Sequence, residues 1–291
     1  RDIKVISVRA VDMEFHADKV VVYTENESYE ADVIVGAFGL DEGTAAAFSR
    51  LTPYKPPQAL DSIVVNYRLY EGELNDFSGT IHAFLPRNSH IEFGAVTPKC
   101  DHLTINIAGQ SVNSPLMHNF LHFPEVEEIL PNSSGRGEGN PKDLRFYKGR
   151  FPRSLARGYY GDRYVMIGDA SGLVRAFKGK GATSAMQTGV RAAETILTQG
   201  ITREAFHHHF QPANRDIIQD LPYGRGMRLA TLFMSRVGVL DWVIRGARKN
   251  ADLRVALFGA VSGHSPYQEI LKISLRPKPI WAILRSVFRD R

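Results

Sequence analysis

The residues best suited to chemistry lie between positions 164 and 189, in the run YVMIGDASGLVRAFKGKGATSAMQTG. Residues 164–167 predict a buried strand, and Gly168 and Asp169 follow directly at its carboxyl end. Open α/β sheets bind their ligands in the crevice at that end of their strands. Because a short carboxylate there can accept hydrogen bonds from a sugar or polyol, this pattern predicts a ligand site at Asp169.

Two glycines and a helix complete the pattern. Gly179 and Gly181 would let a ligand ring approach the backbone, because neither residue has a Cβ. Residues at helical spacing then predict one buried helix face, made of Ala182, Ala185, Met186, Gly189, Val190, Ala193, Ile196 and Leu197. The free N–H groups at the start of this helix would favour negative charge on a ligand. The alternative is that Asp169 only caps a turn, but the ordered set of features favours the ligand site.

The remaining elements predict an α/β protein. Runs around Val5, Val21 and Val33 predict a small antiparallel meander, and its third run, 31–36, is typical of a strand buried on both faces. Strands are predicted at 62–70, 80–85, 91–96 and 103–108, with helices at 115–122 and 125–130. This middle region reads as an antiparallel sheet that carries helices. Helices dominate after residue 200.

Segment 164–189 resembles the second FAD fingerprint of the glutathione-reductase-type flavoproteins. It is most similar to the geranylgeranyl reductase branch, which neighbours the flavin hydroxylases. The run ADVIVGAFG at 31–39 is similar to the family strand that ends in G-A-D-G, and KGRFP at 148–152 sits where the family chain returns from its substrate domain. The resemblance implies a partial Rossmann-like FAD-binding domain at 1–50 and 156–200. It also implies an inserted antiparallel-sheet substrate domain at 51–155 and a helical C-terminal region at 201–291.

The same resemblance implies which residues contact FAD. Asp169 would bind the ribityl and pyrophosphate part, and the Gly-x-Gly loop would lie beside the isoalloxazine. The cofactor-binding residues are then Gly168, Asp169, Gly179, Gly181 and Ala182.

The chain departs from the family pattern at several places. Phe38 replaces the aspartate of G-A-D-G, and residues 176–178 lack the usual proline. The run IHAFLP at 81–86 replaces the aromatic anchors that line the lipid cavity of geranylgeranyl reductases. The first fingerprint, G-x-G-x-x-G after a strand, is missing. We therefore expect an upstream segment of the same protein to supply it, and this fragment alone to bind FAD weakly or not at all.

The resemblance implies an FAD-dependent oxidoreductase, with NAD(P)H or another compound as electron donor. We expect a reductase or dehydrogenase of a small apolar or lipid-like substrate, with isoprenoids as one such class. A flavin-dependent monooxygenase is an alternative, and so is a non-catalytic binding protein that keeps the fold. No catalytic acid or base is assigned. His82 is a candidate, and an ordinary sheet histidine is its alternative interpretation.

Composition limits the remaining possibilities. Cys100 is the only cysteine, which excludes an internal disulfide and a thiolate metal cluster and suits a reducing, cytoplasmic compartment. Adjacent histidines at 207–209 point in different directions on a helix, so we predict no metal site there.

Positive charge is concentrated near the C-terminus. Residues 221–291 contain 13 Lys/Arg and 4 Asp/Glu. We expect no nucleic-acid partner and favour a solvated basic helix face. The run 280–284 beside Arg285 is both apolar and basic, so peripheral contact with an anionic membrane is one interpretation. A helix packed on the protein by the same apolar face is the other.

Overall fold

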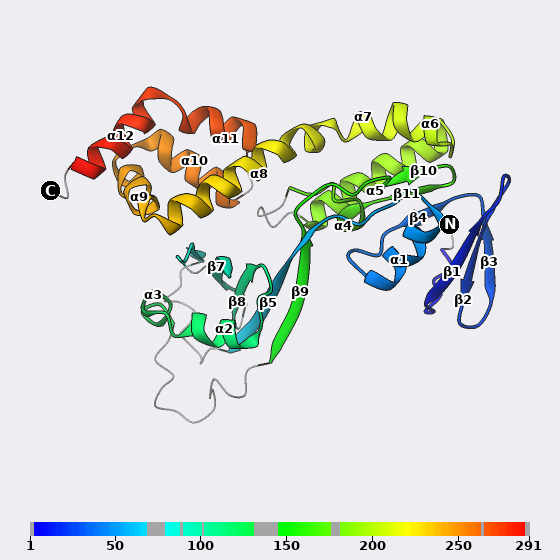
Figure 1. Ribbon diagram of the computed structural model, residues 1–291, viewed down its shortest axis with the longest axis horizontal. Coiled ribbons are helices and arrows are strands. Elements are labelled where there is room, and N and C mark those ends of the chain that lie inside the picture. Colours follow the sequence, from blue (N-terminus) through cyan, green and yellow to red (C-terminus); the bar gives the residue numbers. More distant parts are fainter. Residues whose placement is uncertain are drawn as a thin grey trace. The chain divides into compact units, whose positions relative to one another are not determined.

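The computed structural model describes residues 3–68, 79–87, 90–100, 102–130, 145–175, 181–262 and 265–288. It divides into two compact units (Figure 1). The first unit comprises Arg1–Ala59 with Pro152–Gly224, and the second comprises Leu60–Phe151 with Arg225–Arg291. Each unit thus combines two stretches that are far apart in the sequence. The fold is mixed α/β, with antiparallel sheets and a helical C-terminal region.

The first unit begins with an antiparallel meander, as predicted, but the predicted run 31–36 is not its third strand and contributes to another sheet. The strands of the meander are β1 (Ala10–Phe15), β2 (Val20–Thr24) and β3 (Ser28–Ala31). The prediction of a strand that includes Val5 is wrong, since residues 3–9 form none and Val5 is exposed. β2 ends at Thr24, opposite Ala10, so the residues before Ala10 have no neighbouring strand to bond.

A second sheet in this unit brings two distant strands together. β4 (Ile34–Gly36) lies parallel to β11 (Tyr164–Met166), and β10 (Tyr160–Gly161) pairs antiparallel with the other edge of β11. All of β11 is buried, as predicted. β4 differs from the prediction, because Val35 is exposed and no described element covers that face.

Helices of very different lengths pack around these sheets. They are α1 (Glu42–Leu51), α4 (Gly168–Ser171), α5 (Gly181–Thr198), α6 (Arg203–Ala205), the π-helix η4 (Phe206–Phe210) and α7 (Gln211–Ala213). The core between them is rich in aromatic rings, with Phe48, Tyr54, Phe206 and Phe210 almost completely buried. Each such ring buries about 150–250 Å² of surface and so contributes strongly to the stability of this core.

The second unit contains a five-stranded sheet in the order β6-β7-β8-β5-β9. The strands are β5 (Ala59–Arg68), β6 (His82–Phe84), β7 (Ile91–Pro98), β8 (His102–Gly109) and β9 (Phe146–Pro152). The pairs β5–β8, β7–β8 and β6–β7 are antiparallel, as the sequence predicted. Alternate residues of β8, such as Leu103, Ile105 and Ile107, are completely buried, which is the period of two expected for a strand with one covered face.

Two helices contribute to the core on that face. They are α2 (Ser114–Leu121) and α3 (Pro124–Glu127), close to the predicted positions. Phe120 of α2 lies directly over Gly94, where a Cβ would be only 2.4 Å from its ring. The predicted loop at 132–141 lies outside the described residues.

The C-terminal region is helical, as predicted. It contains α8 (Arg215–Arg236), α9 (Val239–Lys249), α10 (Ala251–Ser262), α11 (Tyr267–Ser274) and α12 (Pro277–Phe288). Small apolar clusters hold α9, α10 and α12 together, around Leu240, Val243 and Leu253. Among the described residues, every helix is too short or too polar to cross a bilayer.

Candidate cofactor-binding site

The turn after β11 is fixed in an unusual backbone conformation. Ile167 continues the parallel pairing by donating its N–H to the Gly36 carbonyl at 3.0 Å. Gly168 then has φ of 56°, and Gly172 has φ of 68° at the end of α4. Both values lie in the left-handed region that favours glycine. The strand therefore ends in a tight helical turn that holds Asp169.

Thr188 of α5 binds this turn from the side. Its hydroxyl oxygen accepts the Gly168 N–H at 2.9 Å and donates to the Ser184 carbonyl at 2.8 Å. Thr188 is completely buried. The helix comes so close that a Cβ on Gly168 would lie 3.1 Å from the Ala185 Cβ. The turn and the helix are thus fixed to each other by a buried hydrogen bond and by close packing.

The side chain of Asp169, in α4, lies beside the first residue of α5. The position of a Cβ built on Gly181, the first residue of that helix, is 3.7 Å from the Asp169 Oδ1. Asp169 is half-buried, and burial raises the pKa of its carboxyl above the ordinary value. Among the described residues, its carboxylate accepts no hydrogen bond. A desolvated carboxylate of this kind is stabilised when a ligand supplies donors.

The other predicted contact residues are placed differently. Gly181 is half-buried beside Asp169, and Ala182 is exposed in the first turn of α5. Gly179 lies outside the described residues. The structure therefore brings Gly168, Asp169 and Gly181 together around the start of α5.

The predicted buried face of α5 is only partly correct, because Ala185 packs beside Gly168 and Gly189 beside Ile167, but most of its other residues are exposed. The buried residues of α5 are Ser184, Thr188, Ala192 and Thr195, whereas Met186, Val190 and Leu197 are exposed. Small and hydroxyl side chains let the helix approach the Gly168 turn, and the Thr188 hydroxyl accepts the hydrogen bond from the Gly168 N–H. That polar contact, and not the apolar stripe, decides which face is buried.

Aromatic residues support the turn from the other side. The Tyr54 hydroxyl donates to the Ala170 carbonyl at 2.8 Å, and burial raises the pKa of this hydroxyl. Phe38 stacks on Phe48 with ring centroids 5.6 Å apart, and its edge meets Tyr54 at 6.0 Å. The residue that replaces the family aspartate therefore packs among aromatic rings and provides no polar contact. Sequence reasoning missed Tyr54, which carries no local signal of its partner 116 residues away.

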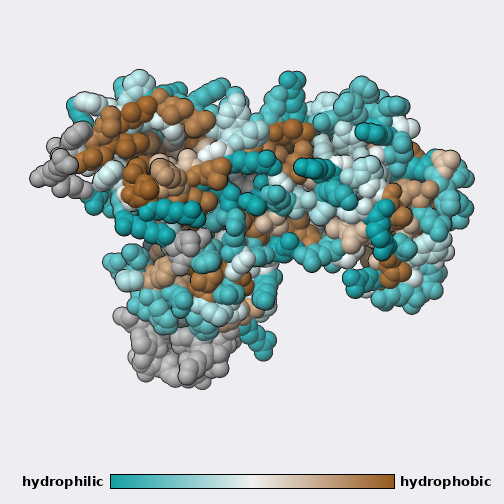
Figure 2. All heavy atoms as spheres, in the orientation of Figure 1, coloured by the Kyte–Doolittle hydropathy of each residue, from teal (hydrophilic) through white to brown (hydrophobic). Residues whose placement is uncertain are grey.

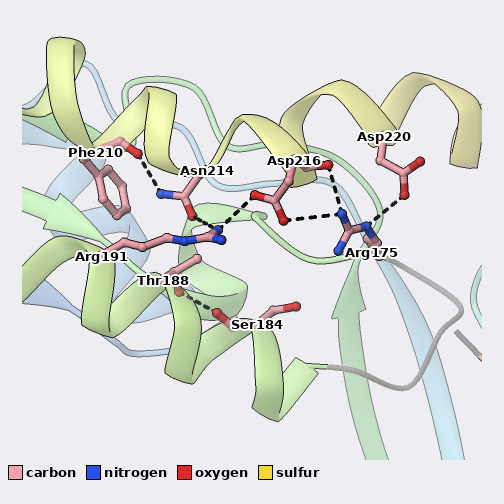
Figure 3. Close-up of polar contacts among 8 residues, drawn as sticks. All are labelled: Arg175, Ser184, Thr188, Arg191, Phe210, Asn214, Asp216 and Asp220. Atoms are coloured by element: carbon pink, nitrogen blue, oxygen red, sulfur yellow. Dashed lines mark hydrogen bonds and ion pairs between the residues drawn. The ribbon is translucent and has the colours of Figure 1, made fainter. Parts of the chain in front are cut away.

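An ion-pair network fixes the chain just after the turn (Figure 3). The Arg175 Nε lies 2.8 Å from the carboxylate of Asp220, which is only 3% exposed. Arg175 also donates to the Asp216 carbonyl at 2.9 Å, and Arg191 of α5 donates to the Asp216 carboxylate at 3.0 Å. Buried Asn214 joins through a 3.0 Å bond from Arg191. The network thus links residue 175, α5 and the first turns of α8.

A shallow pocket of about 230 Å³ lies elsewhere in the first unit. Tyr164, Tyr160 and Arg203 contribute to its walls. Tyr164 is the first residue of β11, and Asp169 lies three residues beyond its last residue, Met166, so this pocket and Asp169 are at opposite ends of the strand. Beside it, the Tyr160 hydroxyl lies 3.0 Å from His207 Nδ1. No group of three or more potential ligands among the described residues is placed to hold a metal ion.

In the second unit, His82 lies opposite Val96 and two residues before Phe84. Phe84 packs edge-on against Phe120 of α2 at 5.5 Å. Alternate residues of a strand share a face, so His82 belongs to the face that packs on α2. Ala83 belongs to the other face, where it and the flanking Ile81 and Leu85 are exposed.

Several solved structures share this architecture. A flavoprotein/dehydrogenase from Cytophaga hutchinsonii matches 98% of this chain and 70% of its own, at 16% identity and a TM-score of 0.63. A geranylgeranyl bacteriochlorophyll reductase-like protein from Thermoplasma acidophilum matches 96% of this chain and 68% of its own, at 13% identity and a TM-score of 0.60. The flavin-dependent brominase Bmp2 matches 98% of this chain and 71% of its own, at 14% identity and a TM-score of 0.55. The sequence matches no protein-family model and no curated protein.

These likenesses define the class by fold. The chain shares the fold of these flavoproteins, in agreement with the resemblance seen in the sequence. Similarity at sequence identities of 13–16% establishes a shared architecture, and it does not establish a particular reaction.

Proposed function

We propose that this protein is a flavin-dependent oxidoreductase whose Asp169 binds FAD. The observation that carries this proposal is the half-buried Asp169 carboxylate, which has no donor among the described residues and lies beside Gly181 at the start of an 18-residue helix. The ribityl chain of FAD offers hydroxyl donors that suit such a carboxylate. When bound, the flavin would supply the hydride or electron transfer that protein side chains cannot perform.

The chain's own residues would orient the cofactor. Thr188 and Tyr54 fix the turn that holds Asp169, so the carboxylate would be placed before the ligand arrives. Gly181 leaves room beside it, and the N-terminal N–H groups of α5 would favour negative charge on the ligand. Gly179 and Ala182 remain proposed contacts of the isoalloxazine.

We further propose that an upstream segment of the same protein completes this site. Among the described residues, β4 has a neighbouring strand on one side only, and parallel pairs are usually part of larger covered sheets. Met186, Val190 and Leu197 form an exposed apolar stripe along α5. A strand and helix that carry the first fingerprint would pair with β4 and cover this stripe.

The proposed substrate is small and apolar or lipid-like. Its support is the uncovered face at β6, where Ile81, Ala83 and Leu85 expose apolar atoms. We propose that the enzyme is a reductase, which would take electrons from NAD(P)H or another donor, or a dehydrogenase, which would take them from the substrate itself. No described residue is assigned as its acid or base, and the placement of His82 on the face covered by α2 does not favour it.

The test is the visible absorbance of the protein in its natural full length, measured beside the 291-residue chain. We expect flavin bands in the complete protein and a large loss of bound flavin in Asp169→Ala. Asp18→Ala, an exposed position outside the site, is the control and should retain the flavin. A colourless complete protein that ignores added FAD would leave the alternative of a binding protein that keeps the fold.

The likeness to a flavin-dependent brominase favours one further candidate, a monooxygenase-type reaction. Oxygen consumption separates the two classes. A reductase with its electron donor, or a dehydrogenase with an electron acceptor, turns over its substrate under anaerobic conditions, whereas a monooxygenase stops without oxygen.

A further inference from the structure

The last helix of the chain, α12, has two apolar faces. On one face, Ile283 packs against the cluster around Leu240 and Val243, and the Ser286 hydroxyl donates to the Trp242 carbonyl at 2.8 Å. The other face carries Ile280, Trp281 and Leu284, which are 41%, 56% and 44% exposed. Leu284 lies four residues after Ile280 and three residues after Trp281, so it neighbours both on the helix surface, and the three residues form one outward apolar surface.

Basic residues flank this outward surface. Lys278 and Arg285 are exposed, and the Arg285 guanidinium lies 5.2 Å from the centre of the Trp281 ring. Within the part of the chain that the structure describes, neither cation has an acidic partner. Residues 225–288 contain 11 Lys/Arg and only 3 Asp/Glu, so the surrounding field is positive as well.

We propose that the outward face of α12 docks on the surface of an anionic lipid bilayer. Tryptophan and arginine are suited to the boundary between headgroups and acyl chains, because each combines an apolar body with a polar end. Ile280 and Leu284 would enter the outer acyl region, while Lys278 and Arg285 would remain at the level of the anionic headgroups. Figure 2 shows hydrophobic residues gathered over the C-terminal helices, α12 among them.

Charge favours lipid over a second copy of the chain. A symmetric dimer through this face would bring the Lys278 and Arg285 pairs of two identical surfaces together, at a cost in repulsion. An anionic bilayer instead neutralises these charges and accepts the apolar side chains. The proposal does not depend on flavin binding, because it rests on α12 and its neighbours alone.

The experiment is co-sedimentation of the full chain with vesicles of phosphatidylcholine alone, or of phosphatidylcholine mixed with phosphatidylserine. We expect strong binding only to the mixed vesicles, weakened by added salt as charges are screened. Lys278→Glu should weaken binding at least about fivefold, since each basic residue near an anionic surface contributes about that factor. Leu284→Ser should weaken it by a similar factor through the loss of apolar contact.

Two matched variants control for general effects. Lys99→Glu changes an exposed lysine in the second unit, and Leu51→Ser changes a leucine that is 46% exposed in the first. Both should bind mixed vesicles like the natural chain. Three outcomes would overturn the proposal. The controls could lose as much binding as the α12 variants, or the natural chain could bind both vesicle types equally. The chain could also fail to bind vesicles and instead form a dimer that Leu284→Ser dissociates.

Discussion

Gly168 donates its backbone N–H to the Thr188 hydroxyl at 2.9 Å, across twenty residues of sequence. The bond joins the turn that carries Asp169 to the helix whose first residues lie beside it. Because Gly168 and Thr188 are both buried, water cannot replace either partner. The geometry of the proposed flavin site therefore depends on a threonine in the middle of α5.

Thr188→Val should lower the free energy of unfolding by about 1–3 kcal/mol, because it leaves the buried Gly168 N–H without an acceptor. Urea denaturation measures this change. Thr195→Val is the matched control on the same helix, since its hydroxyl donates only to the Arg191 carbonyl of its own helix at 2.9 Å. The control should change stability by less than about 1 kcal/mol. Equal losses in both variants would contradict the role given to Thr188.

Gly172→Ala should destabilise the protein by at least about 2 kcal/mol. Its φ of 68° is unfavourable for alanine, and the new Cβ would lie 2.1 Å from the Ser154 carbonyl oxygen. Gly226→Ala is the control, because no neighbouring atom lies within 4 Å and the residue is inside α8. That change should be neutral or stabilising by up to about 1 kcal/mol. Thermal unfolding of both variants, compared with the natural protein, measures the two changes in stability.

Arg175→Ala should cost at least about 1 kcal/mol of stability, because it removes the 2.8 Å ion pair between Arg175 and Asp220, whose side chain is 3% exposed. Arg225→Ala removes an exposed arginine from the same helical region and should change stability by less than about 0.5 kcal/mol. Chemical denaturation compares the two. If the network positions the cofactor segment, Arg175→Ala should also bind flavin more weakly under conditions where it is fully folded.

Asp169→Asn should act in opposite directions with and without flavin. Burial raises the pKa of this carboxyl in the folded state, so its ionised form opposes folding. The asparagine variant should therefore melt at a higher temperature than the natural protein at pH 7. This advantage should shrink as the pH falls through the raised pKa, and vanish below the ordinary value of 3.8.

Bound flavin should reverse this effect of Asp169→Asn. A hydrogen bond to a charged group contributes about 1.5–3 kcal/mol, so the variant should bind flavin about ten- to a hundredfold more weakly. Titration of the complete protein with FAD, followed by fluorescence, measures the loss. An unchanged affinity for FAD would show that Asp169 does not bind the cofactor.

The order of the elements could be predicted from the sequence because it depends on local patterns. The buried run of β11, the Gly168-Asp169 pair after it, the alternation along β8 and the helical C-terminal region all follow from short periodicities. The flavoprotein fold followed from a motif of about 26 residues read in order. Each of these signals is complete within a single segment.

Contacts between distant segments were decided only by the tertiary structure. Periodicity predicted an apolar buried face for α5, but the helix buries Ser184 and Thr188 because the turn at Gly168 needs an acceptor. Periodicity also could not show whether the apolar residues of α12 pack on the protein or face outward. The helix does both, because Ile283 packs on the protein and Trp281 faces outward. A sequence records which side chains share a face, whereas burial depends on which neighbour that face meets, and that neighbour lies elsewhere in the chain.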